Sequence, residues 1–554
     1  MKFASFLTLL VILSASIAVA VSAADDGSEG CLVLIDFGNG KVLWTSVEVQ
    51  ENLSAFNVTM DAAGQLGLDV SYSESSFGVF VNGIGGVMGD WPNEWWHFWI
   101  WNAASKAWES ATQGPSSVAA KDIVAIAWSY VMDRPDFSAQ SPLATPDHKY
   151  PWTSLRHDLL STGSSQTGSS AKISLDWDKD LTNGPVSTSV VAANDRLYVL
   201  TSGVYDWTQM TYDSPPHLSC LNRAGEILWN ATIDGAKYQI ASPMITEDFV
   251  VVPSSNGKVY AFDSKTGAPY WISGIESSGT GLTSSPILYR NQVIVGGGDG
   301  KLYSFADNGT LLWATKVASS IYFSSPAARD GMVYIGSEEG QLHAVAANGT
   351  GEIWNVTVGG KVRSAPLLLE NEIVVTYSTY EDITAVDGGA VAVSYDGEEL
   401  WRVDVNATSS SAAETINGVV VSSADGLTMI SLGGQVIWRT SLGAHITGSP
   451  SVGKDAIYAV TSEEQSRVVA VNLSGAIIWS YALEPKQYSM CSPTISDDVL
   501  YVTSDNGHVY AFSLIEPEQV GGGNMLLLII VFIGIFTILM IGAIGNWIGR
   551  KREG

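Results

Sequence analysis

The most informative stretch of this sequence, residues 284–313, reads SSPILYRNQVIVGGGDGKLYSFADNGTLLW. Its segments QVIVGG and KLYSFA alternate apolar with polar residues at a period of two and contain Val, Ile and Tyr, which predicts β-strands. The glycine-rich segment 296–300 between them is either a phosphate-binding loop or a hairpin turn. A phosphate loop leads into the N-terminus of a helix, whereas KLYSFA is another strand. We therefore predict a turn with a positive φ at Gly300.

The same pattern recurs along the chain. Four segments align with 296–300, and each ends in a Gly that follows Asn, Asp or Glu: 253–257, 336–340, 422–426 and 503–507. Tryptophan recurs at intervals of about 42 residues, which is the length of a propeller blade. These repeat tryptophans are Trp177, Trp229, Trp271, Trp313, Trp354, Trp401, Trp438 and Trp479. Most of them end a G-x-x-x-W motif such as GTLLW, which points to one supersecondary unit used many times.

The repeats predict an eight-bladed β-propeller over residues 166–513. Ser-Pro or Ala-Pro pairs, with Gly184-Pro185 as an early variant, mark starts near 184, 242, 285, 325, 365, 412, 449 and 492. The last unit ends after three strands, while the strand of Trp177 precedes the first unit. That strand is expected to complete the last blade, which closes the ring and removes both sheet edges. Seven blades is the alternative if the weak unit near 412 is merged with a neighbour.

The segment AFDSKTGAPYW at 261–271 matches the signature A-x-D-x-x-T-G-x-x-x-W, so the chain resembles pyrroloquinoline-quinone-like (PQQ-like) repeat proteins. The lead-in PWTSLRHDLLSTG at 151–163, within a linker over 136–165, is similar to the entry sequence of that family. The resemblance spans about 150 to 513 and implies a propeller fold. The family includes quinone-dependent dehydrogenases and the propeller lipoprotein of the outer-membrane β-barrel assembly machine, so the fold alone does not fix the activity.

Residues 31–135 lack the repeat and are expected to form a small α+β domain. We predict strands at both ends, a short helix near Ala55–Leu66, a strand into a turn at GVFVNGIGG, an aromatic strand at EWWHFWIWN and a last strand at DIVAIAWSYV. These features resemble the β-grasp-like C-terminal domain of transcobalamin-like proteins. No corrinoid ligand is carried over, because the partner domain that completes such a site is absent from this sequence.

The aromatic strand of this domain has two interpretations. Its rings form either a platform for a flat ligand or sugar, or the core of a small domain with few other large apolar groups. The residues concerned are Trp91, Trp95, Trp96, Phe98, Trp99 and Trp101. The core is the favoured interpretation, and the platform stays open as a small-ligand receptor.

Both ends of the chain carry membrane-directed signals. An apolar run over 6–21 ends in the small residues AVAVSA, which predicts a signal peptide at 1–23, with a retained anchor as the alternative. After a tether at 514–524, the uncharged residues from Met525 to Ile544 have the length of a transmembrane helix. The basic tail at 545–554 predicts a cytoplasmic C-terminus, so we expect a single-pass protein of the cell membrane with its bulk outside.

Charge and composition restrict the partners. The net charge is −28, from 56 acidic and 28 basic residues, which argues against nucleic acid. The three cysteines are Cys31, Cys220 and Cys491, so at least one thiol is unpaired, and no pairing is assigned. An exterior glycoprotein agrees with N-x-S/T sequons at Asn52, Asn57, Asn230, Asn308, Asn348, Asn355, Asn406 and Asn472.

No motif in the sequence assembles a catalytic or metal site. There is no Cys-Cys pair and the repeats are short, with longer insertions only at 202–217 and 376–389, which argues against quinone catalysis. The seven histidines show no zinc spacing, and G-x-S-x-G is absent. DWDKDLTNG at 176–184 begins like a calcium loop but has Leu181 where Gly is required. We expect no catalytic, cofactor or metal residue.

The sequence therefore favours a non-catalytic binding or scaffold protein for an extracellular protein or glycan partner. The first alternative is a quinone- and calcium-dependent dehydrogenase with a degenerate signature. The second is a small-ligand receptor built on the aromatic residues of 31–135.

Overall fold

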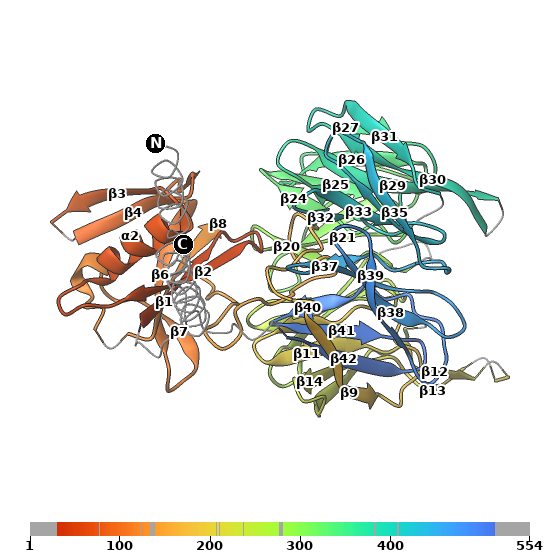
Figure 1. Cartoon of the computed structure of the whole chain (residues 1–554), viewed down its shortest axis with the longest axis horizontal. Helices are drawn as coiled ribbons and strands as arrows, with labels where there is room; N and C mark the ends of the chain where they lie inside the picture. The colour runs from red at the N-terminus through yellow and green to blue at the C-terminus, as the bar shows by residue number, and fades with distance from the viewer. Residues whose placement is uncertain are drawn as a thin grey trace, which may run out of the picture. The chain divides into compact units, whose positions relative to one another are not determined.

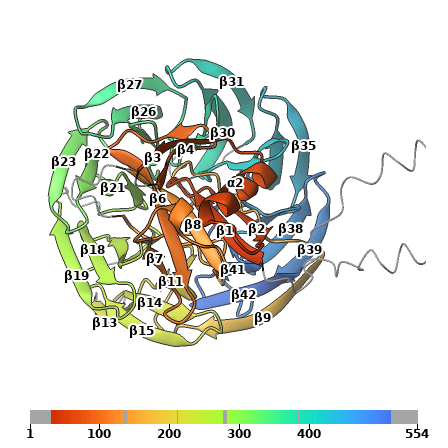
Figure 2. The same ribbon diagram turned by 90° about the vertical axis from the view of Figure 1, so that its left-hand side faces the viewer.

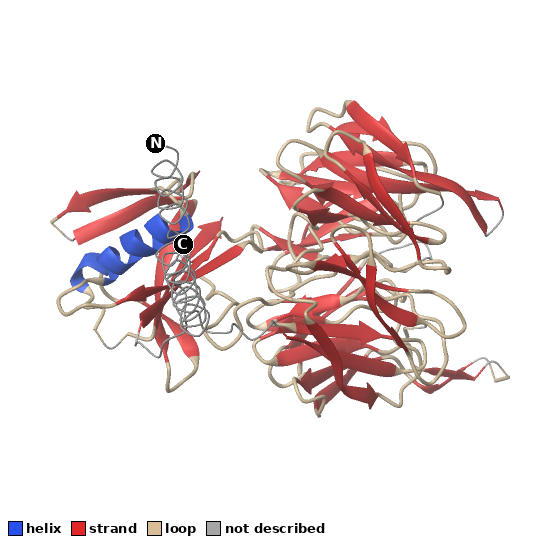
Figure 3. Cartoon of the chain, viewed as in Figure 1, coloured by secondary structure: helices blue, strands red, loops and turns tan. Residues whose placement is uncertain are grey.

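Strands dominate the computed structural model of this chain (Figure 3). The structure describes residues 30–515 apart from 77, 122, 133–138, 207, 210, 237, 276–280, 382–383 and 407–408. The described residues form eleven sheets, eight of which have four strands. We number these four-stranded sheets 1 to 8, beginning with the sheet that contains Val191.

The strands of the eight sheets are as follows. Sheet 1 contains β10 (Val191–Ala193), β11 (Arg196–Leu200), β14 (His217–Asn222) and β15 (Ile227–Thr232). Sheet 2 contains β16 (Met244–Ile245), β17 (Phe249–Pro253), β18 (Lys258–Asp263) and β19 (Pro269–Gly274). Sheet 3 contains β20 (Ile287–Tyr289), β21 (Gln292–Gly296), β22 (Lys301–Phe305) and β23 (Leu311–Lys316). Sheet 4 contains β24 (Ala327–Arg329), β25 (Met332–Gly336), β26 (Gln341–Ala346) and β27 (Glu352–Thr357).

The second half of the series follows the same order. Sheet 5 contains β28 (Leu367–Leu368), β29 (Ile373–Glu381), β30 (Thr384–Val393) and β31 (Glu399–Asp404). Sheet 6 contains β32 (Ala413–Thr415), β33 (Gly418–Ser422), β34 (Gly426–Ile430) and β35 (Val436–Ser441). Sheet 7 contains β36 (Ser451–Val452), β37 (Ala456–Val460), β38 (Arg467–Asn472) and β39 (Ile477–Ala482). Sheet 8 contains β40 (Thr494–Ser496), β41 (Val499–Thr503), β42 (His508–Ile515) and β9 (Lys172–Asp180).

These sheets stand around a common centre, with the fourth strand of each at the circumference (Figures 1 and 2). Neighbouring strands within a sheet are antiparallel, so the second strand of each sheet runs opposite to its first. The fourth strand of sheet 8 is β9, which pairs with β42 from His508↔Asp180 to Ile515↔Lys172. The predicted closing strand is therefore confirmed. It joins residues more than 300 positions apart in the chain, which removes the open edges of the first and last sheets.

The segment 296–300 is a hairpin turn between β21 and β22, as predicted. The Gly300 N–H donates to the Gly297 carbonyl at 2.8 Å, and Gly300 has a φ of +76°. The aligned glycines at 257, 340 and 507 also have positive φ, but Gly426 does not, because it is already the first residue of β34. A Cβ at Gly426 would lie 1.9 Å from the Thr440 carbonyl oxygen. The glycine at that position allows a close backbone approach instead of a turn.

The repeat tryptophans join neighbouring sheets at the circumference. Each of seven tryptophans on a fourth strand packs against the Gly that ends the third-to-fourth-strand turn of the next sheet. A Cβ at Gly309, for example, would lie 2.7 Å from the Trp271 ring, and Gly309 has a φ of +81°. We call these pairs the outer belt: Trp177–Gly225, Trp229–Gly267, Trp271–Gly309, Trp313–Gly349, Trp354–Gly397, Trp401–Gly434 and Trp438–Gly475.

Trp479 of sheet 7 is the exception in this series. Sheet 8 has no turn between its third and fourth strands, because β42 and β9 come from opposite ends of the described chain. No equivalent glycine is present, and the Trp479 ring instead packs edge-on against Phe512 at 5.4 Å between centroids. The exception follows directly from the way in which the ring closes.

Residues 30–132 form an α+β unit with two further sheets. The five-stranded sheet has the order β2 (Val42–Glu48), β1 (Gly30–Asp36), β8 (Ala125–Met132), β6 (Glu94–Asn102), β7 (Ala107–Ser110), with β1 and β8 parallel. The other sheet contains β3 (Val70–Ser75), β4 (Gly78–Ile84) and β5 (Val87–Met88). The helix α2 spans Ala55–Leu66, as predicted, between a Ser54 N-cap and a Gly67 C-cap with a φ of +68°.

The predicted fold class and localisation need correction. The described residues contain two helices, the 12-residue α2 and the three-residue η1 (Pro115–Ser117), and no helix among them is long and apolar enough to cross a membrane. The predicted signal peptide at 1–23 and span from Met525 to Ile544 lie outside the described residues. The eleven sheets also exceed a simple eight-bladed ring. Besides the eight four-stranded sheets and the two sheets of residues 30–132, a two-stranded hairpin, β12 (Val204–Asp206) and β13 (Thr211–Ser214), is inserted between β11 and β14 of sheet 1. The expectation of a single-pass membrane protein is therefore not retained.

Candidate binding site in the central channel

A serine precedes the first strand in seven of the eight sheets. Its Oγ accepts a hydrogen bond from the peptide N–H of the equivalent residue in the preceding sheet, at 2.8–2.9 Å. We call this series the inner belt. Its bonds run from Ser189 to Ser242, Ser242 to Ser285, Ser285 to Ser325, Ala365 to Ser411, Ser411 to Ser449, Ser449 to Ser492 and Ser492 to Ser189. The last bond joins sheet 8 to sheet 1, so the inner belt also closes the ring.

The inner belt corrects one repeat start, explains a second that was weak in the sequence, and has one gap. The first equivalent residue is Ser189, followed by Val, and not the predicted Gly184-Pro185. In sheet 6 the equivalent is Ser411, followed by Ala, which is why that unit looked weak in the sequence. In sheet 5 the position is Ala365, so no Oγ is available there for the Ser325 N–H. No acceptor for that N–H is found among the hydrogen bonds of the described residues.

The segment 152–168 crosses one end of the channel as a strap. It forms backbone hydrogen bonds with six first strands in turn: Trp152 with Ala192, Thr153 with Ile245, Leu159 with Ala328, Leu160 with Leu368, Thr162 with Glu414 and Gly163 with Val452. At its end, the Gly168 N–H donates to Asp498 of sheet 8 at 2.8 Å. These bonds lie after the belt residues, at the ends of the first strands. The strap therefore marks the end of the channel toward which the first strands run.

The opposite end of the channel has an aromatic rim. Its residues precede the belt position of their sheets: Tyr238, Tyr322, Phe323, Arg363, His445, Tyr488 and Met490. Two hairpins, β12–β13 and β29–β30 with Tyr380, extend from the same end (Figure 1). The second strands of their sheets, β11 and β29, run antiparallel to the first strands, so the chain that leaves β11 and the far end of β29 lie at the rim. Tyr238 is 42% exposed and Tyr488 52%. The rim thus presents several large rings to solvent.

Charge on the rim is concentrated at Arg363. Its Nε and Nη2 donate to the two carboxylate oxygens of Glu338 at 2.7 and 2.9 Å, and Lys361 Nζ lies 3.0 Å from the same carboxylate. The guanidinium also lies over the rings of Tyr380 and Tyr322, at 4.6 and 5.1 Å from the centroids. Burial opposes ionisation of Glu338, but the hydrogen bonds from Arg363 and Lys361 outweigh it and lower the pKa of that carboxyl. Two cations thus share one carboxylate.

The belt, the strap and the rim enclose a cavity of 550 Å³. Six serines of the belt line it, with Leu155 from the strap and Arg363, Tyr380 and His445 from the rim. Ser187, Thr283, Ser409 and Thr447 add further hydroxyl groups. None of the described residues that line the cavity is Asp or Glu, which is notable in a chain with a net charge of −28. A second hollow shares His445, Thr447 and Met490 and includes Asp505, whose pKa is raised by burial.

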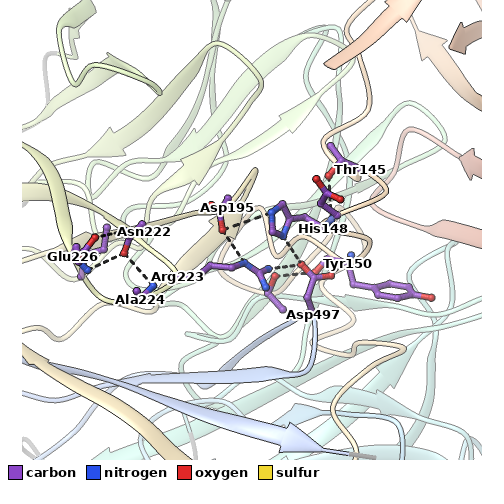
Figure 4. Close-up of polar contacts among 12 residues, drawn as sticks. Thr145, His148, Tyr150, Asp195, Asn222, Arg223, Ala224, Glu226 and Asp497 are labelled. Carbon is purple, nitrogen blue, oxygen red and sulfur yellow. Dashed lines mark hydrogen bonds and ion pairs between the residues drawn. The ribbon is translucent and has the colours of Figure 1, made fainter. Parts of the chain in front are cut away.

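A separate polar cluster fastens the lead-in to the closure of the ring (Figure 4). Arg223 Nη2 forms an ion pair with Asp497, and its Nε lies 3.7 Å from Asp195. His148 lies between the same two carboxylates, at 3.6 Å from Asp195 and 3.5 Å from Asp497. Burial opposes ionisation of Asp497, but the His148 contact, the Arg223 charge and the Tyr150 N–H lower its pKa. This cluster joins sheet 1, sheet 8 and the lead-in, so its role is structural.

The predicted aromatic platform is mostly buried. Trp95, Trp96, Phe98, Trp99 and Trp101 are 4–8% exposed, and only Trp91 is open, at 60%. Alternate rings of β6 pack on the two faces of the five-stranded sheet: Trp96 and Phe98 in the core with α2, Trp99 and Trp101 with Ala144 of the lead-in. This arrangement corresponds to the interpretation of the rings as core residues.

Among the described residues, neither the acidic segment 176–184 nor the cysteines assemble a site. Asp180 accepts the Thr182 N–H at 2.7 Å, and among described residues no group of three His, Cys, Asp or Glu could hold a metal ion. Cys31, Cys220 and Cys491 are free and buried. The channel was missed because its rim residues do not repeat; the recurrent Ser before Pro was the one available signal.

Comparison with known proteins supports the repeat assignment. A family profile described as outer membrane protein assembly factor BamB matches residues 162–322 and 305–516, more than half of the chain. The BamB of Burkholderia pseudomallei is 27% identical over 304 residues, which cover 54% of this chain and 68% of that protein.

Solved structures show the same fold. BamB from Moraxella catarrhalis superposes with a TM-score of 0.51 at 17% identity, covering 63% of this chain and all of that one. The quinohemoprotein alcohol dehydrogenase from Comamonas testosteroni gives 0.53 at 11% identity, covering 67% and 82%. At these identities the likeness concerns the fold alone. The match of the repeats over 162–516 shows that this chain belongs to the PQQ-like propeller family of the outer membrane protein assembly factor BamB.

Proposed function

We propose that this chain is a non-catalytic scaffold that binds a protein partner through the rim of its propeller. The observation that carries the proposal is the composition of that rim. The Arg363 guanidinium lies over the rings of Tyr322, Phe323 and Tyr380, and Tyr238 and Tyr488 are exposed elsewhere on the rim. Tyrosine and arginine are the residues that dominate binding energy at protein interfaces, whereas exposed Lys, Glu and Asp contribute less. The two hairpins widen this surface beyond the mouth of the channel.

Membership of the BamB family agrees with this proposal, since that relative is named for assembling outer membrane proteins. The rival function is a quinone-dependent oxidoreductase, which the alcohol dehydrogenase neighbour exemplifies. The sequence has no Cys-Cys pair and the repeats carry only two longer insertions, both of which form hairpins at the rim. A scaffold accounts for these hairpins without requiring a reaction.

Site-specific photo-crosslinking tests the proposal. A benzophenone amino acid placed at 238 or 488 should give an adduct with one reproducible partner in the source cell, and the purified partner should form it again. The control positions are Ile416, 87% exposed in the turn after β32 at the strap end, and Ile353, 60% exposed on β27. Equal adducts at all four positions would contradict a rim interface. Dye-linked alcohol or sugar oxidation after addition of quinone and calcium would instead establish the rival.

A further inference from the structure

The inner belt leaves hydrogen-bond donors without acceptors inside the channel. Each belt Oγ is occupied as an acceptor by a peptide N–H, and the Ser325 hydroxyl also donates to the Phe323 carbonyl at 3.4 Å. No acceptor for the hydroxyl hydrogens of Ser242, Ser285 or Ser492 lies among the hydrogen bonds of the described residues. These side chains are more than nine-tenths buried and line the cavity. Buried hydroxyl groups normally find a partner, so this lining is suited to a ligand rich in acceptors.

The charges at the channel mouth also favour a ligand that carries acceptor groups. Arg363 and Lys361 share the single carboxylate of Glu338, so these three groups together carry one net positive charge, and no described residue that lines the cavity is acidic. The acidic side chain nearest in the second hollow is Asp505, whose burial raises its pKa and whose Oδ1 already accepts the Ser187 hydroxyl at 2.7 Å. A carboxylate supplies the acceptors and the complementary charge.

The size and surroundings of the cavity distinguish a peptide from a free small molecule. Its 550 Å³ lies within the range of roughly 300–1,000 Å³ typical of ligand pockets. A small ligand would use only this volume and leave the rings around it uncovered. A peptide that enters the channel stays connected to a partner that covers Tyr238 and Tyr488 on the rim.

From these contacts we infer that the channel receives an extended, carboxylate-bearing peptide segment, which takes hydrogen bonds from the belt hydroxyls and pairs with Arg363. This inference rests on the proposed function and specifies what its partner presents. The segment enters from the rim, because the strap crosses the other end of the channel.

The test uses the purified full chain and fluorescence anisotropy with fluorescein-labelled Gly-Gly-Glu-Glu and its amidated Gln counterpart. We expect the acidic peptide to bind at least tenfold more tightly than the amide. Thr447→Trp, which fills the channel from a wall position outside the belt, should weaken that binding at least tenfold. The matched Thr447→Val should change it less than twofold. Arg363→Gln should remove the preference for the acidic peptide, with folding checked by its Tm.

Each other outcome overturns part of the inference. Equal binding of acid and amide excludes the carboxylate, and undiminished binding to Thr447→Trp excludes the channel. Competition by free glutarate at the same concentration as the peptide identifies a small carboxylate as the ligand instead. If neither peptide binds, the inference fails. The proposed scaffold function would still stand as long as crosslinks at 238 and 488 persist, so the two failures are distinguishable.

Discussion

The inner and outer belts join the same eight sheets by opposite means. The outer belt places large rings on glycines, and a Cβ would lie less than 3.0 Å from the tryptophan in six of the seven pairs and 3.2 Å from it at Gly397. The inner belt uses one small hydroxyl per sheet to hold a peptide N–H, and it continues past Ala365, where the hydroxyl is missing. Close packing at the circumference thus fixes the spacing of the sheets, whereas the centre tolerates a defect. This division allows the centre to remain polar and partly unfilled.

The largest expected effect is a change that breaks the outer belt. Gly309→Ala places a Cβ 2.7 Å from the Trp271 ring at a φ of +81°. The backbone strain and the overpacking together should cost about 3 kcal/mol in the free energy of unfolding. Chemical denaturation monitored by Trp fluorescence measures this loss.

Gly331→Ala is the matched control for that substitution. Gly331 has a φ of +80°, but its Cβ would meet nothing within 4 Å. It should therefore show only the strain, about 1 kcal/mol. Equal losses in the two variants would mean that the contact with the tryptophan does not join the sheets.

The sequence displayed the residues of the outer belt better than those of the inner one for a physical reason. Tryptophan and the glycine before it are conspicuous at a fixed spacing, because they specify a turn and a strand within each repeat. Both belts are contacts between repeats, which the sequence did not predict, and the serine of the inner belt is unremarkable when no proline follows, as at Ser189 and Ser411. The strap and the rim could not be predicted, since their residues do not recur and are brought together only by closure of the ring.

The polar cluster of Arg223, His148, Asp195 and Asp497 should make the stability of the closed ring depend on acid pH. The folded pKa of Asp497 lies below its ordinary value, so its stabilising contribution is present above the unfolded pKa of about 3.9 and is lost as pH falls through the folded pKa. Asp497→Asn should therefore cost about 2 kcal/mol at pH 7, because Arg223 loses the nearer of its two carboxylate partners.

The difference between the wild type and this variant should shrink as the pH approaches 3. Thermal unfolding at several pH values measures it, with Asp61→Asn, an exposed position of α2, as the control. A difference that stays constant from pH 7 to pH 3 would show that the Asp497 charge does not fasten the closure.

A smaller loss is expected from the inner belt itself. Ser285→Ala removes the acceptor of the Ser242 N–H, a bond of 2.9 Å, and leaves a buried donor unpaired. We expect a loss of about 1 kcal/mol in the free energy of unfolding. Ser319→Ala, at an exposed serine of the next sheet-to-sheet connection, is the control and should be neutral. A loss as large as that of Gly309→Ala would remove the distinction between the two belts.

The smallest expected effect is a gain in stability, which tests the geometry of the inner belt more directly than a loss does. Ala365→Ser supplies the Oγ that the Ser325 N–H lacks, and it adds one hydroxyl to the lining of the channel. If the gap is only a missing acceptor, the free energy of unfolding should rise by about 0.5–1 kcal/mol. Amide hydrogen exchange at Ser325 should slow in the same variant, since exchange reports the new bond directly. An unchanged exchange rate together with a lower Tm would mean that the backbone at Ala365 departs from the geometry of the inner belt. The missing hydrogen bond at Ala365 would then be a local feature of the channel mouth beside Arg363, which the other seven belt positions do not share.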